Sequence, residues 1–440
     1  MKKPLSTLLG CIGTALLLGA CGQTSTPTAQ TVRQAAPTQI VTVMKPGTAT
    51  DQQLEALYGG HLITRTDTFA LIGRTGNAPA LPLQTLGTSN TYVAEQNTGV
   101  ITAPEKISAN GLGVWGDSLG VWGDGLGVWG DGLGVWGDGL GVWGDGLGVW
   151  GDGTYNVIPA NTSPWQQIGL EQAQNTATTL GRNVTIAVLD TGIDLTHTAF
   201  GGTLTPSSTW KDYVDGDATP QDEGVVGVGL AGHGTEVAGI ALQIAPGAKI
   251  MPVRVLDSDG TGNVDDVVSG IVWAVQHGAS IINLSLGADI SMTAVNQAIA
   301  YANSQNVLVV GAAGNKGNEG LDYPAADFAS PLDISVGSVS GQRLKSGFSQ
   351  YGSSLNVLAP GERIYGPVPA NRMGAWSGTS MSTPVVSGAL ALGLSQQATA
   401  TRAAAALRAS AGSLDATNPL YQGKLGTGQI DLAAFTDQLK

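Results

Sequence analysis

Short apolar runs alternate with amphipathic stretches between residues 163 and 440. Continuous apolar runs at 184–189, 250–256, 281–286 and 307–313 have the length of strands that are buried on both faces. Residues 264–276 and 292–303 lie between such runs and show the apolar spacing of amphipathic helices. The alternation predicts an α/β fold, with a doubly wound, mostly parallel sheet and helices on both faces.

Residues 39–105 follow a different pattern. Residues 39–43 alternate like a strand, and two more strand-like pieces occur at 61–63 and 68–72. Between them, residues 50–58 have the apolar spacing of a short helix, for which Asp51 is the expected N-cap. The segment therefore predicts a small α+β unit that precedes the larger one.

Residues 111–153 contain six tandem seven-residue units of Leu-Gly-Val-Trp-Gly-Asp-Gly, the first of which ends in Ser118. A seven-residue period can indicate a coiled coil, but each glycine would cost a helix about 1 kcal/mol. A repeating strand and turn is one alternative, and disorder with transient Trp clustering is the other. The regular repetition favours a passive linker, while binding to a cell wall, a glycan or a partner stays open.

Length and charge bound the number of domains and the kinds of partner. With 440 residues the chain is long enough for two or three domains. The formal net charge is −13 and only 12% of the residues are charged, so no excess of Lys and Arg is present to neutralise phosphates. This argues against nucleic acid as a partner.

The first residues predict export. Lys2 and Lys3 precede an apolar stretch at 5–18, which is the pattern of a signal peptide over residues 1–20. The stretch ends in Leu-Gly-Ala-Cys21, which resembles the lipobox of bacterial lipoproteins and implies a lipid on Cys21 that holds the protein at a membrane. Ordinary cleavage, with Cys21 incidental, is the alternative. We expect an extracytoplasmic protein whose residues 21–38, rich in Thr, Gln and Ala, form a flexible tether.

Cysteine usage agrees with this interpretation. The only cysteines are Cys11 and Cys21, and both lie in the N-terminal segment. The mature protein is therefore expected to have no disulfide, although it is exported, and an even number of cysteines does not indicate a disulfide framework here. Its stability must come from a large core or from bound ions.

Three short motifs in the larger unit carry candidate chemistry. Asp190 follows an apolar run in Asp-Thr-Gly, His233 lies in Gly-His-Gly-Thr-Glu-Val-Ala-Gly, and Ser380 lies in Gly-Thr-Ser-Met-Ser-Thr-Pro before an apolar run. Each has an ordinary structural interpretation, because Asp often ends a strand, and His or Ser often begins a helix. Ser380 at a helix start is alternatively a nucleophile whose helix N-terminus faces a developing oxyanion.

Together the motifs resemble those of the subtilase family, over residues 163–440. The chain order Asp, His, Ser is the subtilisin order. The resemblance implies a subtilisin-like fold in which Ser380 attacks the scissile carbonyl, His233 transfers the proton and Asp190 orients the imidazole. It also implies that the preceding α+β unit is a propeptide, although an unrelated surface module is the alternative.

The resemblance extends to the substrate cleft. Ala312-Ala313-Gly314-Asn315 matches the segment that supplies an oxyanion-hole side chain, here Asn315. Ser285-Leu286-Gly287 resembles the edge strand that pairs with substrate backbone, and with Ala312, Ala313 and Gly314 it would flank the pocket for the residue before the cut. Glu236 stands where the family often has a second His, and from this difference we expect altered packing or pH response rather than inactivity.

One acidic loop resembles a calcium loop of thermitase-like subtilases. Its candidate ligands are Asp212, Asp215, Asp217, the carbonyl of Thr219, and Gln221. Calcium prefers six to eight oxygen ligands of these kinds. The resemblance implies structural calcium and no catalytic cofactor, and a solvated acidic turn is the alternative.

These observations predict a secreted or surface-anchored serine endopeptidase that is made as a self-inhibited precursor and acts on proteins or peptides. A surface-anchored interaction protein, in which the Trp repeats bind and the larger unit is a scaffold, is the main alternative. Peptide ligation by the same three residues is a third.

Overall fold

The computed structural model describes residues 37–76, 78–81, 91–97, 101–102 and 158–440. The predicted signal peptide, most of the tether and the repeats at 111–153 lie outside the described residues. Within the described part, no helix has both the length and the apolar character needed to cross a membrane.

The N-terminal unit is a four-stranded antiparallel sheet with one helix. Its strands are β1 (Gln39–Met44), β2 (His61–Arg65), β3 (Phe69–Arg74) and β4 (Tyr92–Gln96), in the order β2-β3-β1-β4. The helix α1 (Asp51–Tyr58) is capped by Thr50, whose hydroxyl accepts from Gln53 N–H at 3.2 Å. The prediction of Asp51 as N-cap was wrong by one residue, because Thr50 and Gln53 form a reciprocal capping box.

The two faces of this sheet have different neighbours. Val41 and Ile72 pack with Leu54 of α1 in a small core of their own. Ile40 and Leu71, which point the other way, belong to the large core of the rest of the chain. Side chains of a strand alternate between faces, so β1 and β3 each contribute to both cores.

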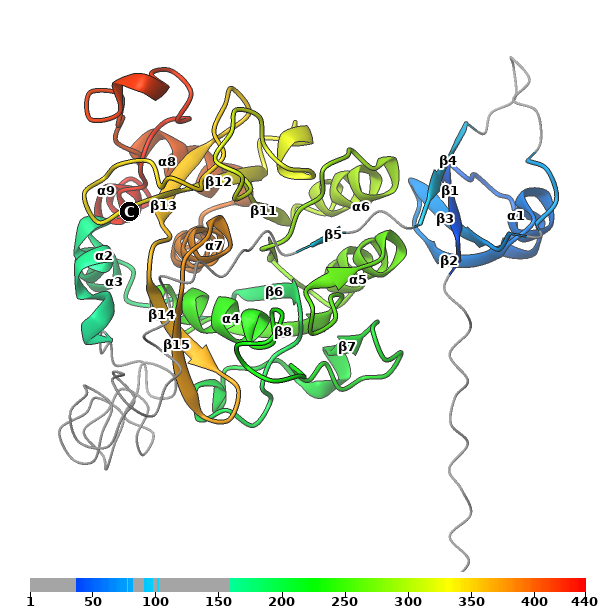
Figure 1. The fold of residues 1–440 in the computed structure, drawn as a ribbon, viewed down its shortest axis with the longest axis horizontal. Coiled ribbons are helices and arrows are strands. Elements are labelled where there is room, and N and C mark those ends of the chain that lie inside the picture. Colours follow the sequence, from blue (N-terminus) through cyan, green and yellow to red (C-terminus); the bar gives the residue numbers. More distant parts are fainter. Residues whose placement is uncertain (1–36, 77, 82–90, 98–100, 103–157) are drawn as a thin grey trace, which may run out of the picture. The chain divides into compact units, whose positions relative to one another are not determined.

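Seven parallel strands form the main sheet, in the order β13-β12-β11-β10-β6-β8-β7 (Figure 1). They are β6 (Thr185–Asp190), β7 (Lys211–Asp212), β8 (Lys249–Arg254), β10 (Ile281–Leu284), β11 (Leu308–Ala312), β12 (Asp333–Val339) and β13 (Val357–Pro360). All residues of β10, β11, β12 and β13 are buried. The continuous apolar runs predicted this for β10 and β11, whereas β12 and β13 were not predicted.

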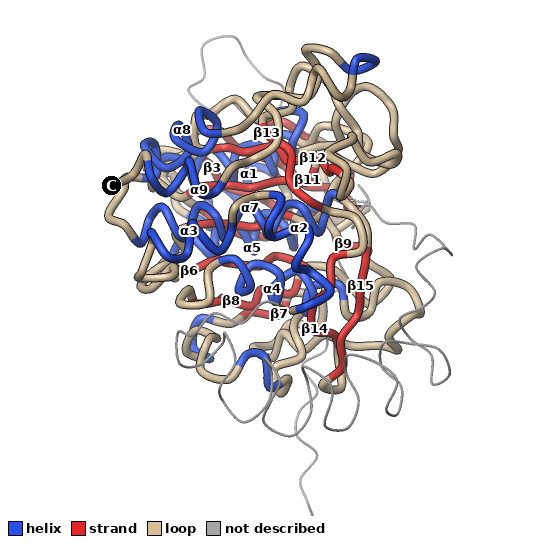
Figure 2. The backbone as a smooth tube through the Cα atoms, turned by 90° about the vertical axis from the view of Figure 1, so that its left-hand side faces the viewer, coloured by secondary structure: helices blue, strands red, loops and turns tan. Residues whose placement is uncertain are grey.

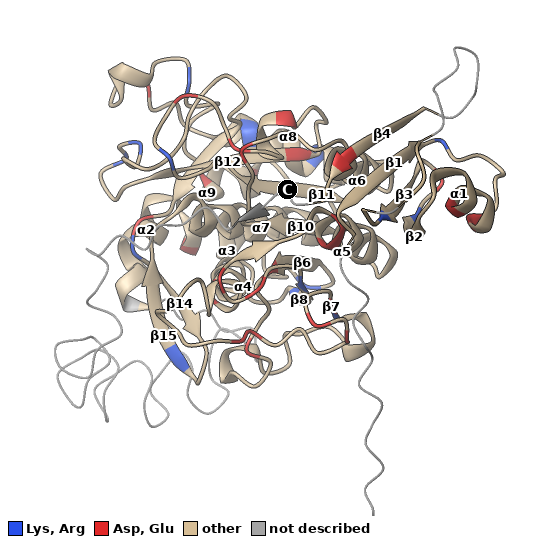
Figure 3. Cartoon of the chain, turned by 45° about the vertical axis from the view of Figure 1, so that its right-hand side comes forward, with Lys and Arg blue, Asp and Glu red and all other residues tan. Residues whose placement is uncertain are grey.

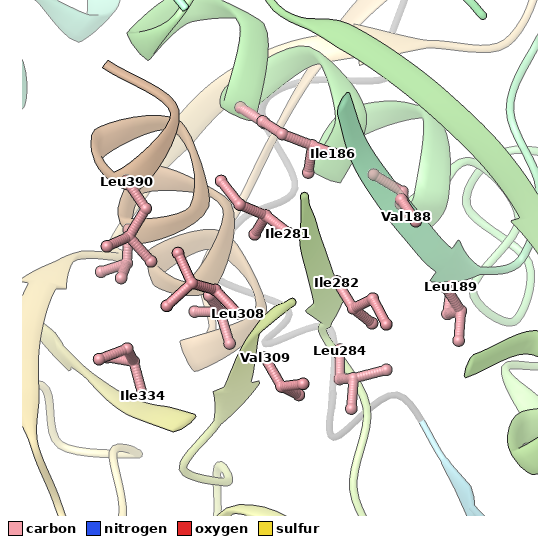
Figure 4. Close-up of a cluster of buried hydrophobic side chains, with 14 of the residues drawn as sticks. Ile186, Val188, Leu189, Ile281, Ile282, Leu284, Leu308, Val309, Ile334 and Leu390 are labelled. Carbon is pink, nitrogen blue, oxygen red and sulfur yellow. The ribbon is translucent and has the colours of Figure 1, made fainter. Parts of the chain in front are cut away.

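Helices cover both faces of this sheet. On one face α4 (His233–Ile244) contacts α7 (Thr379–Ser395), and α7 crosses β10, β11, β12 and β13. On the other face α5 (Val264–Gln276) contacts β6 and β8, while α6 (Thr293–Ser304) contacts β11 and α5. Figure 4 shows Leu390 of α7 beside Ile281 and Leu308, and all three side chains are fully buried. The predicted doubly wound α/β fold is therefore confirmed.

The remaining elements enclose this framework (Figure 2). An antiparallel hairpin, β14 and β15, packs on α4, and α9 lies between α3 and α8. A second short antiparallel pair joins β5, which precedes the repeats, to β9. These elements are α2 (Thr162–Gln167), α3 (Leu170–Thr176), α8 (Ala400–Ser410), α9 (Leu432–Asp437), β5 (Ile101–Thr102), β9 (Thr261–Gly262), β14 (Ile364–Val368) and β15 (Arg372–Trp376).

Candidate active site

The carboxylate of Asp190 meets the imidazole of His233. Asp190 is the last residue of β6 and His233 is the first of α4. Nδ1 of His233 lies 2.6 Å from Oδ1 of Asp190, and both side chains are buried. The same Oδ1 accepts from Thr191 N–H at 2.8 Å, which fixes the carboxylate. Because Nδ1 faces Asp190, Nε2 lies on the far side of the ring.

Close packing beside this pair explains a glycine of the His233 motif. A Cβ on Gly234 would lie 2.3 Å from the carbonyl oxygen of Gly192 and 3.0 Å from the Cβ of Asp190. Any side chain at residue 234 would therefore push the helix that carries His233 away from Asp190.

Ser380 lies in the first turn of α7 and is fully buried. The N-cap of α7 is Gly378, so Ser380 does not cap its helix. Its hydroxyl donates to the carbonyl of Ser285 at 3.4 Å, and Oγ of Ser285 donates back to the carbonyl of Ser380 at 2.9 Å. This exchange ties the start of α7 to the segment that follows β10, at the carboxyl ends of the strands, where α/β proteins place their chemistry.

Asn315 is held by the residue before Ser380. Its side-chain oxygen accepts from the backbone N–H of Thr379 at 2.9 Å and from the hydroxyl of Thr379 at 3.0 Å. Because the oxygen faces Thr379, the amide nitrogen is turned to the other side of the group, so Asn315 presents a donor in a fixed orientation close to Ser380.

A second buried carboxylate supports the loop that carries His233. Oδ1 of Asp222 accepts from Gly232 N–H at 2.9 Å, and Oδ2 accepts from the hydroxyl of Thr235 at 2.6 Å. Burial raises the pKa of Asp222 to about 7, against the lowering effect of its hydrogen bonds. No sequence motif marks Asp222, and only its place 11 residues before His233 hinted at a role.

The other side of His233 is aromatic. The ring of Trp376, at the end of β15, stacks on the imidazole with centroids 5.5 Å apart and an interplanar angle of 30°. The backbone N–H of Trp376 donates to the buried carboxylate of Glu236 at 3.3 Å. Glu236, singled out as a departure from the family motif, therefore anchors the strand that carries Trp376.

Two chain segments reach the start of α7 from neighbouring strands. Ser285, Leu286 and Gly287 follow β10, and Ala313 and Gly314 follow β11, whose last residue is Ala312. Gly314 N–H donates to the Thr379 hydroxyl at 3.2 Å. The segment 285–287 is not an edge strand of the main sheet, because β10 is an interior strand that ends at Leu284.

A short strand that the sequence analysis missed lies nearby. Thr261 and Gly262 of β9 pair antiparallel with Thr102 and Ile101 of the N-terminal unit. Nothing in a two-residue strand distinguishes it in the sequence, because it is defined only by its partner. The pairing joins the segment that follows β4 to the segment that follows β8.

Two of the five predicted calcium ligands, Asp212 and Asp215, contact an arginine. Arg254 on β8 contacts Asp212 at 3.0 Å, Asp215 at 2.5 Å and Glu223 at 3.1 Å. Burial opposes the charge of Arg254, but these carboxylates together raise its pKa. Figure 3 shows the basic position of β8 beside the acidic turn after β7.

The other candidate ligands face protein groups. Gln221 turns its oxygen to Leu195 N–H at 3.2 Å, and the Asp217 carboxylate accepts from Thr219 N–H at 2.7 Å. Within the described residues, no three His, Cys, Asp or Glu side chains are grouped to hold a metal. The arrangement in this structure therefore does not fit calcium, and the ligand set stays a prediction.

Comparison with known proteins identifies the family. The model of the subtilase family matches residues 181–427. Thermitase from Thermoactinomyces vulgaris is 38% identical over 266 residues, which are 58% of this chain and 90% of thermitase. Subtilisin NAT from Bacillus subtilis subsp. natto is 37% identical over 261 residues, or 56% of this chain, and the match spans only 64% of that relative.

Solved structures agree. A cold adapted subtilisin-like serine proteinase is 31% identical with a TM-score of 0.51, covering 57% of this chain and 89% of that one. The prenylagaramide maturation protease PagA is 29% identical with a TM-score of 0.53, covering 62% of this chain and 98% of that one. The predicted family, fold and serine-peptidase class are thus confirmed: this chain belongs to the subtilase family.

Proposed function

We propose that the protein is a serine endopeptidase that hydrolyses peptide bonds through Asp190, His233 and Ser380. The observation that carries the proposal is the buried Nδ1–Oδ1 contact of 2.6 Å between His233 and Asp190. A carboxylate in this position fixes the imidazole tautomer with a proton on Nδ1, so Nε2 is the basic atom.

Each residue then has a role that its contacts support. His233 takes the proton of the Ser380 hydroxyl through Nε2 as Oγ attacks the carbonyl carbon, and later gives it to the leaving amine. Asp190 stabilises the imidazolium that forms between these steps. The side-chain amide of Asn315, oriented by Thr379, donates to the developing oxyanion.

The N-terminal unit acts in this proposal as a propeptide that fills the cleft. Its strand β5 already pairs with β9 in the manner of an extended peptide. Glu95 accepts from the N–H groups of Thr293 and Ala294 at 2.8 and 3.2 Å, and Asn97 donates to Asp265 at 2.9 Å. The unit thereby caps α6 and contacts the start of α5, which favours both inhibition and assistance in folding.

A fluorophosphonate probe tests the proposed nucleophile. We expect the full chain, after removal of the N-terminal unit, to be labelled on Ser380, and Ser380→Ala to lose the label. Ser382→Ala is a matched control, because its buried hydroxyl is bonded to the carbonyl of Ala359 at 3.0 Å and has no proposed role. Labelling that survives Ser380→Ala would refute the proposal.

A lipid on Cys21 would hold the enzyme on the outer side of a membrane. The support is the Leu-Gly-Ala-Cys21 pattern after an apolar stretch. Mass analysis of the purified protein should find a diacylated N-terminal cysteine, and Cys21→Ala should move the protein from the membrane fraction to the medium. An unmodified Cys21, or a membrane fraction unchanged in Cys21→Ala, contradicts the anchor.

Calcium binding at the loop of Asp212 and Asp215 would require Arg254 to release both carboxylates. The loop offers carboxylate and carbonyl oxygens, which suit calcium, whereas the guanidinium now neutralises them. We expect millimolar calcium, compared with a chelator, to raise the Tm of Arg254→Ala more than that of the unchanged protein. No calcium response in either protein would exclude this site.

A further inference from the structure

A buried carboxylate lies between the two segments that reach Ser380. Asp322 is 6% exposed, and its backbone N–H donates to the carbonyl of Ala313 at 2.9 Å. A Cβ on Gly314 would lie 2.6 Å from Oδ2 of Asp322, and a Cβ on Gly287 would lie 3.1 Å from its Cβ. A side chain at residue 314 would therefore take the space of this carboxylate, and Gly287 packs closely against the Cβ of Asp322; these two glycines belong to the two segments predicted to flank the pocket.

The same two segments place this carboxylate within the site. Ser285, two residues before Gly287, exchanges hydrogen bonds with Ser380, and Gly314 N–H donates to the Thr379 hydroxyl at 3.2 Å. A side chain that enters between the segments from a peptide bond held at Ser380 would thus meet Asp322.

The two oxygens of Asp322 have different surroundings. Oδ1 holds the ammonium of Lys316 at 2.7 Å. Oδ2 has no hydrogen-bond partner among the residues that the structure describes, and it is the oxygen that lies against Gly314. Oδ2 is therefore open to a donor from a ligand, and a charged donor forms a stronger hydrogen bond with a carboxylate than a neutral one does.

The charges of Asp289, Asp322 and Lys316 do not balance, so this group can bind a second cation. Lys316 also contacts Asp289, so one ammonium is shared by two carboxylates and the group keeps one net negative charge. The side chains of Lys316 and Asp289 are 49% and 77% exposed, and ion pairs this exposed contribute little stability. A cation that approaches Oδ2 would neutralise the group and, if it needs space, displace Lys316 toward Asp289.

We propose, on the basis of the endopeptidase function above, that this pocket takes Lys or Arg as the residue before the scissile bond and that Asp322 receives its charge. A buried charged hydrogen bond of this kind discriminates strongly against neutral side chains, which leave Oδ2 without a donor. An acidic side chain is repelled. Asp322 is thus a specificity-determining residue of the proposed peptidase.

Matched peptides test this specificity. The full chain, after it has processed itself, is assayed for kcat/KM on peptides that differ only before the cut, with Arg, Lys, Gln, Phe or Glu. We expect Arg and Lys to exceed Gln by about tenfold to a hundredfold, and Asp322→Asn to remove most of that ratio. Lys316→Ala should increase it. Asp437→Asn, which breaks an exposed ion pair between the last residue of α9 and Lys440, should leave it unchanged.

The ratio of two peptides does not depend on how much of a variant is folded, so a destabilised Asp322→Asn protein still gives a decisive result. Preference for Phe or Gln over Arg and Lys in the unchanged protein would overturn the specificity proposal while the endopeptidase function stands. An equal Arg-to-Gln ratio in Asp322→Asn and the unchanged protein would also overturn it. If no peptide is cleaved and Ser380 takes no fluorophosphonate, both proposals fail together.

Discussion

Glu95 should stabilise a helix that has no cap of its own. The N-cap position of α6 is Met292, which offers no side-chain hydrogen bond. The carboxylate of Glu95, from strand β4, instead accepts from Thr293 N–H at 2.8 Å and from Ala294 N–H at 3.2 Å. Glu95→Ala removes both acceptors and the negative charge at the helix N-terminus, while the backbone pairing of β4 with β1 is kept.

The magnitude follows from the two contributions. Loss of an N-cap acceptor costs about 0.5–2 kcal/mol, and loss of a negative charge at a helix N-terminus costs about 0.3–1 kcal/mol. Because Glu95 is half-buried, we expect a total of about 1–2 kcal/mol, which corresponds to a factor of about 5–30 in an opening equilibrium. Glu95→Gln keeps one acceptor and should fall between the two.

Amide hydrogen exchange in a Ser380→Ala background, where self-cleavage is blocked, measures this opening directly. We expect the protection of Thr293 and Ala294 to drop by about 5- to 30-fold in Glu95→Ala. Gln96→Ala is a matched control, because Gln96 is the exposed neighbour in the same strand. Unchanged protection in Glu95→Ala, or an equal loss in Gln96→Ala, would refute the capping argument.

Three further predictions concern the site and its surroundings. Asn315→Ala should lower kcat by about 10²- to 10³-fold with little change in KM, a magnitude known for subtilisins rather than worked from these contacts; a loss confined to KM would contradict its role. Asp222→Ala should lower kcat and the Tm together, because Gly232 and Thr235 lose their acceptors beside His233. Asp415→Ala, which removes a half-buried loop carboxylate that accepts from Gly423 N–H, should leave kcat unchanged. Burial lowers the pKa of His197, whose Nδ1 accepts from Ala199 N–H and whose Nε2 faces the carbonyl of Arg372. As the pH falls below about 6.5, the unfolded chain therefore takes up a proton at His197 before the folded protein does. Its contribution to stability is therefore complete above that pH and is lost below it, and His197→Gln should flatten the decline of Tm between pH 7.5 and 5.5; an equally steep decline in the variant would contradict this assignment.

Local patterns in the sequence were sufficient to predict several strands and helices of the larger unit and the chain order of the Asp190, His233 and Ser380 motifs. The apolar runs predicted four strands of the main sheet to within two residues, because a strand buried on both faces must be apolar throughout. Residues 264–276 were predicted as a helix with the bounds that α5 has. The strand predicted at 281–286 is two residues longer than β10, which ends at Leu284. Ser285 leaves the sheet and forms a hydrogen bond with Ser380 instead.

The chemistry of the site was predicted less completely. Asp190, His233 and Asn315 lie in motifs specific enough to be found without a structure, and the structure brings Asp190 to His233 and Asn315 to the residue before Ser380. Glu95, Asp222 and Asp322 carry no motif. Their contacts are with residues that are distant in the sequence. Glu95 accepts from the N-terminus of α6, Asp222 supports the loop of His233, and Asp322 lies beside Gly287 and Gly314.

The sequence by itself determined the family, the α/β class and the residues that can carry a proton, because these depend on residue type and spacing along the chain. Only the tertiary structure decided which charges meet. Arg254 lies among the carboxylates of a loop that resembles a calcium site, and Lys316 shares its ammonium between Asp289 and Asp322. The physical reason is that electrostatic contacts depend on distance and burial in three dimensions, which neighbouring positions in the chain do not specify.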